Sequence, residues 1–301
     1  MSVSTPTDTA CGAATIAVAR SLADLREWVA GRRAAGMRIG LVPTMGALHE
    51  GHLSLVELAA VDDHAVVMSI FVNPTQFGPS EDFDAYPRDE AHDFALAQAS
   101  GVGCVFAPPA EVMYPDGFST TVSVSGPSRG FEGAARPSHF DGVATVVAKL
   151  LLAVRPHRAV FGAKDAQQLA VIRRLVLDLH LDDLDLIEAP TIREDDGLAM
   201  SSRNRYLTED DRRAARGLSR GLFAAMALAD RGETSSVALI AAARHEMESE
   251  PRCEIEYVAL VDAESFQPIA QLTSRSARLC TAARVGPARL IDNVPLRATA
   301  H

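Results

Sequence analysis

The alternation of apolar runs with amphipathic segments predicts a βαβ architecture in the first two thirds of the chain. Short apolar runs predict buried strands at 37–43, 65–72, 102–107, 159–161 and 185–189. Apolar residues at helical spacing between these runs predict helices at 21–33, 51–60, 89–100, 142–154 and 166–179. Strands and helices that alternate at this pitch are typical of a Rossmann-like α/β fold, a parallel sheet with helices on both faces.

The pattern changes after Pro190. Two segments rich in Ala and Arg predict helices at 208–230 and 235–249, and strand-like runs follow at 255–261, 277–283 and 288–293. We therefore predict two domains, a Rossmann-like domain at 1–190 and a smaller α+β domain at 191–301. Residues 1–15 are small and polar and are expected to be frayed, and residues 126–139, which contain Gly and Pro, are expected to form a long loop.

Charge and composition exclude several classes of partner. The chain has 301 residues with 29 Lys+Arg against 39 Asp+Glu, a formal net charge of −10. Binding of nucleic acid or of an acidic membrane needs a basic excess or stripe, so neither is expected. The longest apolar stretch, 143–154, is interrupted by Lys149 and is too short to span a bilayer. Four scattered cysteines without a CxxC pair, and no signal-peptide pattern, indicate free thiols in a cytoplasmic protein.

The most informative segment is Pro43–His52, PTMGALHEGH, between a predicted strand and a predicted helix. In a parallel sheet this junction lies at the carboxyl end of the strands, where ligands bind, and the helix N-terminus favours phosphate. His49 and His52 are three residues apart and share a helical face, from which two imidazoles can donate hydrogen bonds to phosphate oxygens. The pair could also be half a metal site, but the Glu of HExxH is not in place and no second ligand pair follows.

HEGH matches the H-x-G-H signature of the nucleotidylyltransferase superfamily, and the whole decapeptide resembles the pantoate–β-alanine ligase family. Five further motifs agree in order: SIFVNPTQF (Ser69–Phe77), DAYPR (Asp84–Arg88), EGAARPSHF (Glu132–Phe140), FGAKDAQQL (Phe161–Leu169) and DGLAMSSRNRYL (Asp196–Leu207). The resemblance extends to LIDN (Leu290–Asn293). It implies ATP-dependent joining of pantoate to β-alanine through pantoyl adenylate, with release of AMP and pyrophosphate, and it implies Mg²⁺ and a homodimer.

The resemblance also implies an ATP site built from three segments. These are Met45, Gly46, Ala47, Leu48, His49, Glu50, Gly51 and His52; Gly162, Ala163, Lys164 and Asp165; and Ile192, Met200, Ser201, Ser202 and Arg203. Within this set, the implied catalytic residues are His49, His52, Lys164, Ser201, Ser202 and Arg203. The chain has only two lysines, Lys149 and Lys164. Lys164 can bind phosphate with a compact ammonium group, and Asp165 can accept hydrogen bonds from ribose hydroxyls. The MSSR segment resembles the KMSKS signature and is expected to hold the triphosphate as a loop that closes from the second domain.

Two glutamines suit the acid substrate, because a neutral amide can bind hydroxyl and carboxylate oxygens and leave the carboxylate nucleophilic. By resemblance Gln76 and Gln168 bind pantoate, and Gln76 also lies near β-alanine. Pro43 and Met45 are expected to line the apolar part of the site. Asp93 matches an acidic position of the family and is the predicted Mg²⁺ ligand, since Mg²⁺ usually takes one or two carboxylates plus phosphates.

Two rival functions stay open on the sequence. An aminoacyl-tRNA synthetase shares the H-x-G-H signature, but it needs a basic surface for tRNA and this chain carries −10. A non-catalytic nucleotide sensor would not need both glutamines together with the HEGH, KD and SSR segments. The sequence also departs from the family at Ala163, where Glu is usual, and at Ala166, where an aromatic residue is usual.

Overall fold

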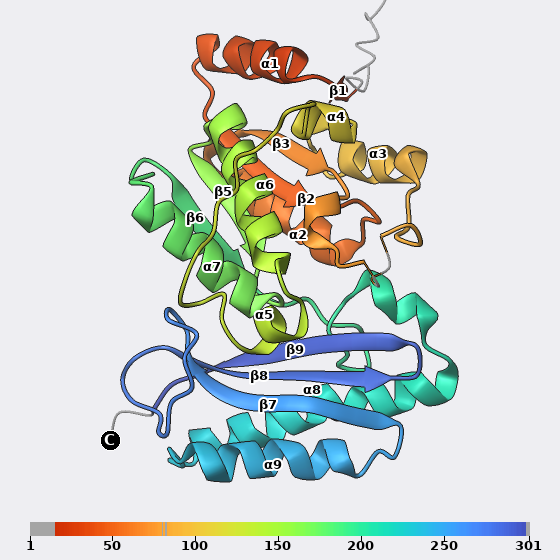
Figure 1. Ribbon diagram of the computed structural model, residues 1–301, viewed down its shortest axis with the longest axis vertical. Coiled ribbons are helices and arrows are strands. Elements are labelled where there is room, and N and C mark those ends of the chain that lie inside the picture. The colour runs from red at the N-terminus through yellow and green to blue at the C-terminus, as the bar shows by residue number, and fades with distance from the viewer. Residues whose placement is uncertain (1–15, 80, 82, 299–301) are drawn as a thin grey trace, which may run out of the picture.

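The computed structural model describes residues 16–79, 81 and 83–298, so the segment 1–15 that we expected to be frayed lies outside the described residues. The described chain forms a six-stranded parallel sheet and a three-stranded antiparallel sheet (Figure 1). The parallel sheet contains β1 (Ala17–Ala19), β2 (Ile39–Thr44), β3 (Ala65–Ile70), β4 (Cys104–Phe106), β5 (Arg158–Gly162) and β6 (Asp185–Ala189). The antiparallel sheet contains β7 (Cys253–Asp262), β8 (Ala277–Val285) and β9 (Ala288–Leu296). Both sheets confirm the predicted fold class.

The strand order of the parallel sheet determines where a ligand can bind. The order is β1-β4-β3-β2-β5-β6, so β2 lies between β3 and β5 and the direction of winding reverses between β2 and β5. Ligands of such sheets bind outside the carboxyl ends of the strands at this reversal. The HEGH segment follows β2 and the KD segment follows β5, so the topology brings both predicted phosphate-binding segments to one place.

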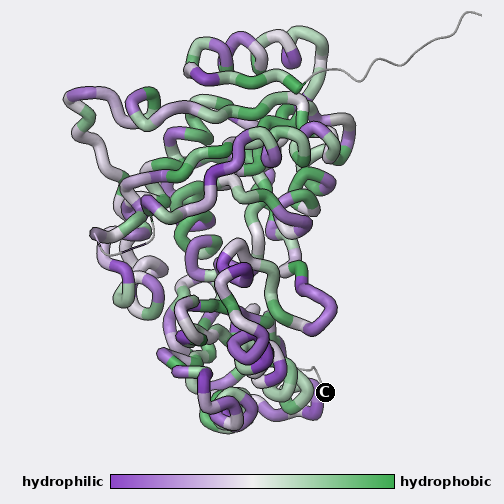
Figure 2. The backbone as a smooth tube through the Cα atoms, turned by 90° about the vertical axis from the view of Figure 1, so that its right-hand side faces the viewer, coloured by the Kyte–Doolittle hydropathy of each residue, from purple (hydrophilic) through white to green (hydrophobic). Residues whose placement is uncertain are grey.

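Helices cover both faces of the parallel sheet, as predicted. On one face α1 (Leu22–Ala34), α6 (His139–Val154) and α7 (Ala166–Asp178) share one apolar core with the strands. On the other face α2 (Glu50–Ala59) and α3 (Glu90–Ala99) share a second core. Figure 2 shows the hydrophobic residues concentrated in the interior strands and the polar residues on the outer turns of the helices. Burial of this apolar surface is the main stabilising contribution to the fold.

Short elements escaped the prediction. They are β1, α4 (Ala110–Met113), α5 (Phe131–Ala135) and the 3₁₀ turns η1 (Val61–Asp63), η2 (Pro74–Gln76) and η3 (Ser202–Tyr206). The expectation of a continuous loop over 126–139 was wrong, because α5 lies inside it. A five-residue helix is too short to show a periodic pattern, and tertiary contacts hold it: the Glu132 N–H donates to Gln167 Oε1 at 3.0 Å, and Arg289 pairs with the Glu132 carboxylate.

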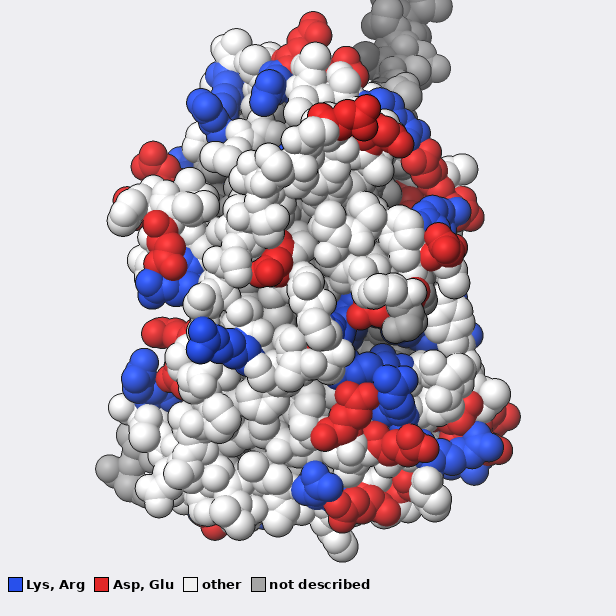
Figure 3. Space-filling model, viewed as in Figure 1, with Lys and Arg blue, Asp and Glu red and all other residues white. Residues whose placement is uncertain are grey.

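The C-terminal part is an antiparallel sheet covered by α8 (Glu209–Asp230) and α9 (Ser236–Glu248), with a core of its own. A small apolar cluster joins this sheet to α7 and consists of Ala166, Ala170, Ala259, Val261, Phe266 and Cys280. The predicted boundary near residue 190 falls between β6 and η3, and we retain it as a proposal. Within the described ranges, none of the helices has the length and apolarity needed to cross a membrane. On the face seen in Figure 3, acidic and basic side chains are interspersed.

Candidate active site

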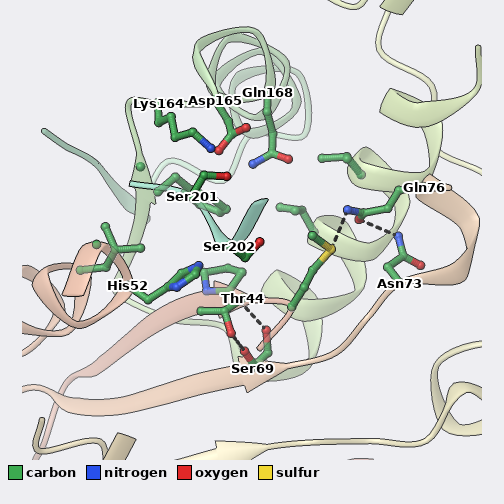
Figure 4. A pocket seen from close by; sticks show the side chains of 18 of the residues that line it. Thr44, His52, Ser69, Asn73, Gln76, Lys164, Asp165, Gln168, Ser201 and Ser202 are labelled. Carbon is green, nitrogen blue, oxygen red and sulfur yellow. Dashed lines mark hydrogen bonds between the residues drawn. The ribbon is translucent and has the colours of Figure 1, made fainter. Parts of the chain in front are cut away.

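A cavity of about 240 Å³, here called the central cavity, opens at the carboxyl ends of β2, β3 and β5 (Figure 4). Most of the predicted site residues line it: Pro43, Met45, His49, Gly51, His52, Gln76, Gly162, Lys164, Asp165, Gln168, Ile192, Met200, Ser201, Ser202 and Arg203. The other predicted residues stand behind the wall, with Gly46, Ala47, Leu48 and Ala163 buried and Glu50 exposed. Residues from both predicted domains therefore meet in one cavity.

The two histidines occupy the start of α2. His49 is the N-cap residue and His52 follows three positions later, so that the ring centroids lie 4.1 Å apart. The position of the His49 ring explains why the HEGH motif has glycine at position 51. A Cβ atom at Gly51 would lie 2.9 Å from Cε1 of the His49 ring, which is closer than real contacts allow. The motif thus needs glycine at this position because the His49 ring rests on its backbone.

Burial keeps both imidazoles uncharged at neutral pH. Burial, with a smaller contribution from the nearby Lys164 ammonium, lowers the pKa of His49 to about 4 and the pKa of His52 to about 3. The Nδ1 atoms of both rings are buried and have no hydrogen-bond partner among the described residues. An unpaired buried polar atom costs about 1–3 kcal/mol of free energy. A polar ligand that bonds to these two nitrogen atoms removes this cost, which favours its binding.

Asp93 holds the HEGH loop instead of facing the cavity. Its side chain is 2% exposed, and its two carboxylate oxygens accept from the backbone N–H groups of Ala47 at 2.9 Å and Leu48 at 2.8 Å. Ala47 has φ of 50°, in the left-handed region that is unfavourable for alanine, so the loop needs such a support. The structure therefore gives Asp93 a positioning role and does not support the predicted Mg²⁺ ligand.

The described residues offer no other metal centre in place of Asp93. Within the part of the chain that the structure describes, no three His, Cys, Asp or Glu side chains converge as metal ligands. Asp165 is the single carboxylate among the described residues that line the central cavity. A Mg²⁺ ion at this site would consequently depend on ligands that the nucleotide and water supply, and the residues present do not form a resident metal site.

The KD loop is held from the other domain. Asn293 on β9 donates through its Nδ2 atom to the carbonyl oxygens of Ala163 and Lys164, both at 2.9 Å. Its Oδ1 atom accepts from Arg278 Nη1 at 2.7 Å, and Arg278 also pairs with Glu188 at the end of the parallel sheet. LIDN, which only marked the end of the family resemblance, thus contributes a residue that positions the lysine loop.

The MSSR segment is fixed at its base. The Met200 N–H donates to the Ile192 carbonyl at 2.9 Å, and Ser201 accepts from the Arg203 N–H at 3.3 Å as the cap of η3. Arg193 forms two hydrogen bonds with Asp292 on β9, at 2.7 and 3.0 Å. Figure 4 shows Ser201 and Ser202 directed into the central cavity. We call His49, His52, Lys164, Ser201 and Ser202 the phosphate wall.

Further lining residues lie in quoted motifs without a predicted role, among them Asn73, Tyr86, Arg136 and His139. His139 Nδ1 donates to the Gln76 carbonyl at 2.8 Å, and Arg136 Nη1 donates to His139 Nε2 at 3.2 Å, which fixes the tautomer. Burial and the neighbouring guanidinium of Arg136 lower the pKa of His139. Asn73 Nδ2 donates to Gln76 Oε1 at 3.1 Å. We call Asn73, Gln76, Arg136 and His139 the amide wall.

Comparisons with known proteins agree with this site. The family model described as pantoate-beta-alanine ligase matches residues 17–295. The chain is 53% identical to a pantothenate synthetase of Rhizorhabdus wittichii over 279 residues, 92% of this chain and 97% of the relative. It is also 53% identical to that of Myxococcus xanthus over 282 residues, 93% of this chain and 96% of the relative.

Solved structures give the same result. The crystal structure of pantothenate synthetase from Thermus thermophilus matches with a TM-score of 0.85 and 45% identity, over 93% of this chain and 99% of that one. The ligase from Francisella tularensis, described in complex with beta-gamma ATP and beta-alanine, matches with a TM-score of 0.73 and 30% identity, over 95% and 99% of the two chains. The chain belongs to the pantoate-beta-alanine ligase family.

Proposed function

We propose that this ligase uses ATP to convert pantoate to pantoyl adenylate and then transfers the pantoyl group to the amine of β-alanine. One observation carries the proposal: the central cavity at the reversal of the sheet is lined by the phosphate wall, by the amide wall and by Gln168. The complex of the Francisella tularensis ligase with beta-gamma ATP and beta-alanine supports it as the property of a relative. The alignments with the Rhizorhabdus wittichii and Francisella tularensis relatives, which cover 92% and 95% of this chain, support it further.

In the first half-reaction, a carboxylate oxygen of pantoate attacks the α-phosphorus of ATP. The bond from that phosphorus to the bridging oxygen breaks, and its electrons leave with pyrophosphate. No protein nucleophile is needed, so the contribution of the chain is orientation and stabilisation of negative charge. His49, His52 and Lys164 supply donors to the phosphate oxygens, and Ser201–Arg203 holds the leaving pyrophosphate. Asp165 accepts from the ribose, and the backbone at Ile192 contacts the adenine.

In the second half-reaction, the amine of β-alanine attacks the acyl carbon of the adenylate. The bond between that carbon and the phosphate oxygen breaks, AMP leaves, and the nitrogen releases a proton to solvent. The amides of Gln76 and Gln168 hold the hydroxyl and carboxyl oxygens of pantoate, while Pro43 and Met45 contact its methyl groups. These four side chains are uncharged, and Arg136, the cation of the amide wall, is paired with Glu81, so the pantoate carboxylate stays nucleophilic.

We further propose that Mg²⁺ enters with the nucleotide, because adenylation of a carboxylate with ATP ordinarily needs the ion. Bound there, it would neutralise phosphate charge. The described residues form no resident metal site, so we derive no step through the ion. Activity should respond to Mg²⁺ in proportion to ATP, with no metal retained by the ligand-free protein after dialysis.

A homodimer in the cytoplasm is the assembly that we propose on the family resemblance. The free, buried thiols of Cys104, Cys253 and Cys280 support a reducing compartment. Light scattering of the purified chain tests the dimer. Closure of the MSSR loop over ATP is part of the same proposal, and hydrogen exchange at 200–206 with and without ATP tests it.

Exchange of labelled pyrophosphate into ATP tests the central proposal. The exchange should require pantoate and should not require β-alanine, because the adenylate forms before the amine reacts. Addition of β-alanine should then release AMP and pantothenate. Exchange that appears only when β-alanine is present would contradict the two-step route. Exchange with an amino acid in place of pantoate would favour the synthetase-like alternative, and ATP binding without exchange would favour a nucleotide sensor.

A further inference from the structure

The side-chain amide of Gln76 faces the central cavity with its nitrogen and is hydrogen-bonded inside the protein through its oxygen. Its Oε1 atom accepts from Asn73 Nδ2 at 3.1 Å, and its Nε2 atom lies 3.0 Å from Met45 Sδ. Gln76 is 8% exposed. Since a primary amide has two donors on nitrogen and acceptors only on oxygen, the orientation decides whether the site donates or accepts a hydrogen bond here.

The backbone carbonyl of Gly142, acting through Asn73, dictates this orientation. Asn73 is 1% exposed and lies 3.1 Å from the carbonyl oxygen of Gly142, which can only accept. The atom of Asn73 that faces this carbonyl must therefore be Nδ2, whatever orientation is assumed at the start. The second hydrogen of that nitrogen faces Gln76, so Gln76 must present Oε1 to Asn73 and Nε2 to the cavity.

Tyr114 fixes the opposite end of Asn73. The Tyr114 hydroxyl donates to Asn73 Oδ1 at 2.7 Å, and the Thr75 hydroxyl donates to the same oxygen at 2.9 Å. Tyr114 does not line the central cavity. Its ring contacts Phe118 and the Lys149 ammonium, and it also lies against Phe71, which lines the cavity. Asn73 is consequently saturated, with both hydrogens donated and its oxygen accepting from two hydroxyls and, at 3.4 Å, from the Thr75 N–H.

The contact between α6 and η2 requires that residue 142 has no side chain. A Cβ atom at Gly142 would lie 2.4 Å from the Thr75 carbonyl oxygen and 2.7 Å from the Gln76 backbone nitrogen. Only glycine allows the α6 backbone to approach η2 closely enough for the Gly142 carbonyl to meet Asn73. His139, one turn earlier on α6, holds the Gln76 carbonyl at 2.8 Å.

We propose that Tyr114 and Gly142 are positioning residues that act through Asn73 to make Gln76 a hydrogen-bond donor toward the substrate. The inference rests on the proposed function and deepens it, because a donor at this position selects an oxygen of the acid substrate and rejects an ammonium group. Gln76 accordingly binds a pantoate oxygen through Nε2 and does not hold the amine of β-alanine through its oxygen. Tyr114 contributes without touching either substrate.

Pyrophosphate exchange at varied pantoate concentration tests the role of Tyr114. Tyr114→Phe removes only the hydroxyl and should raise the KM for pantoate about three- to tenfold, with the KM for ATP unchanged. Gln76→Glu, which keeps the shape and loses the donor, should raise it at least about tenfold. The matched control is Tyr257→Phe, which removes a tyrosine hydroxyl bond of 3.0 Å to Glu132 from a residue that does not line the central cavity, and it should leave the KM for pantoate unchanged.

A double-mutant cycle separates positioning from a general loss of stability. In a Gln76→Ala background, Tyr114→Phe should cause no further rise in the KM for pantoate, because the amide that Tyr114 orients is gone. Independent, multiplying effects of the two substitutions would overturn the proposal, and so would an unchanged KM for pantoate in Tyr114→Phe.

A readout in the ligand-free protein keeps this inference separate from the proposed function. The side-chain amide NMR signals of Asn73 and Gln76, assigned with Asn73→Ser and Gln76→Ala, should shift together in Tyr114→Phe and stay in place in Tyr257→Phe. A wild-type protein that catalyses no pantoate-dependent exchange would overturn the proposed function. Amide signals that do not respond to Tyr114→Phe would overturn the relay through Asn73.

Discussion

In the amide wall, the polar atoms of Asn73 and Gln76 bond to each other and to nearby backbone, whereas in the phosphate wall several polar atoms have no partner among the described residues. Asn73 uses both hydrogens and its oxygen within the protein. By contrast, the Nδ1 atoms of His49 and His52 are buried without partners. One wall is preorganised by its own hydrogen bonds, and the other is completed by the ligand.

The difference corresponds to two tasks. A small carboxylic acid such as pantoate is recognised by the direction of a few hydrogen bonds. Its site therefore benefits from amides whose orientation is fixed before the substrate binds. Phosphate oxygens gain charge during adenylation, so donors without competing partners give most of their energy to the transition state. If this interpretation holds, substitutions in the phosphate wall should reduce kcat, and substitutions behind the amide wall should raise the KM for pantoate.

The largest expected effect is the loss of a donor in the phosphate wall. His52→Ala and Lys164→Ala should each fold normally and lose adenylation kcat by about 10²–10³, roughly 3–4 kcal/mol, because each removes a donor that acts on developing charge. Pyrophosphate exchange measures this loss. Lys164→Arg should restore little, since a planar guanidinium cannot take the place of a compact ammonium. Arg174→Ala, an exposed residue paired with Asp178 on α7, is the control for folding and should keep full activity.

A near-normal kcat with only a raised KM for ATP in Lys164→Ala would break the comparison. It would mean that the phosphate wall binds ground state and transition state equally well. The argument drawn from the rarity of lysine in this chain would then fail as well.

Arg203→Ala should have the next largest effect, confined to one half-reaction. If Ser201–Arg203 holds the triphosphate, the substitution should slow adenylation about 10- to 100-fold, the range of a hydrogen bond to a charged group. Aminolysis of preformed pantoyl adenylate should be almost unchanged, because pyrophosphate has left by that stage. Single-turnover assays of the two steps measure the split. Equal loss in both steps would indicate a damaged fold instead of a lost phosphate contact.

Asn293→Ala should have a smaller effect of the same kind. It removes both hydrogen bonds that hold the carbonyls of Ala163 and Lys164 and leaves the lysine itself in place. We expect adenylation kcat to fall about tenfold, with the KM for pantoate unchanged, because the amide wall does not depend on this loop. Asn293→Asp should not restore activity, since a carboxylate cannot donate to two carbonyl oxygens. A rise in the KM for pantoate equal to the loss in kcat would show that the two walls are coupled.

The parts of this site that the sequence predicted are those whose role depends on neighbours in the chain. His49 and His52 share a face one helical turn apart, which local patterning indicates. Lys164 follows a strand, and the family resemblance was needed to single it out from an ordinary Lys–Asp pair on a loop. The sheet with its covering helices follows from the same patterns of apolar residues.

The parts that the sequence did not predict depend on contacts between distant segments. Asp93 supports a loop 46 residues away in the chain, and Asn293 bonds to a loop 130 residues away, so neither role appears in local spacing. The direction of the Gln76 amide is set by Tyr114 and Gly142, which lie 38 and 66 residues further along the chain and outside the quoted motifs. A resemblance can mark such residues as members of a motif, but only the packing shows what they hold.

The smallest expected effect concerns stability and pH and uses the two histidines of the phosphate wall. Their pKa values in the folded protein, about 4 for His49 and about 3 for His52, lie below the ordinary value of 6.5. As the pH falls below about 6.5, the unfolded chain takes up protons at these residues while the folded chain does not, so the unfolding free energy decreases toward pH 4. The slope is at most about 1.4 kcal/mol per pH unit for each histidine.

Chemical denaturation between pH 7.5 and about 4.5 should show a weaker decrease of the unfolding free energy in His49→Asn and His52→Asn than in the wild type. The His245→Asn variant, at an exposed position, should follow the wild type. Identical slopes in all four proteins would mean that both imidazoles reach solvent and protonate in the folded state. The pKa values would then no longer support the contrast between the amide wall and the phosphate wall.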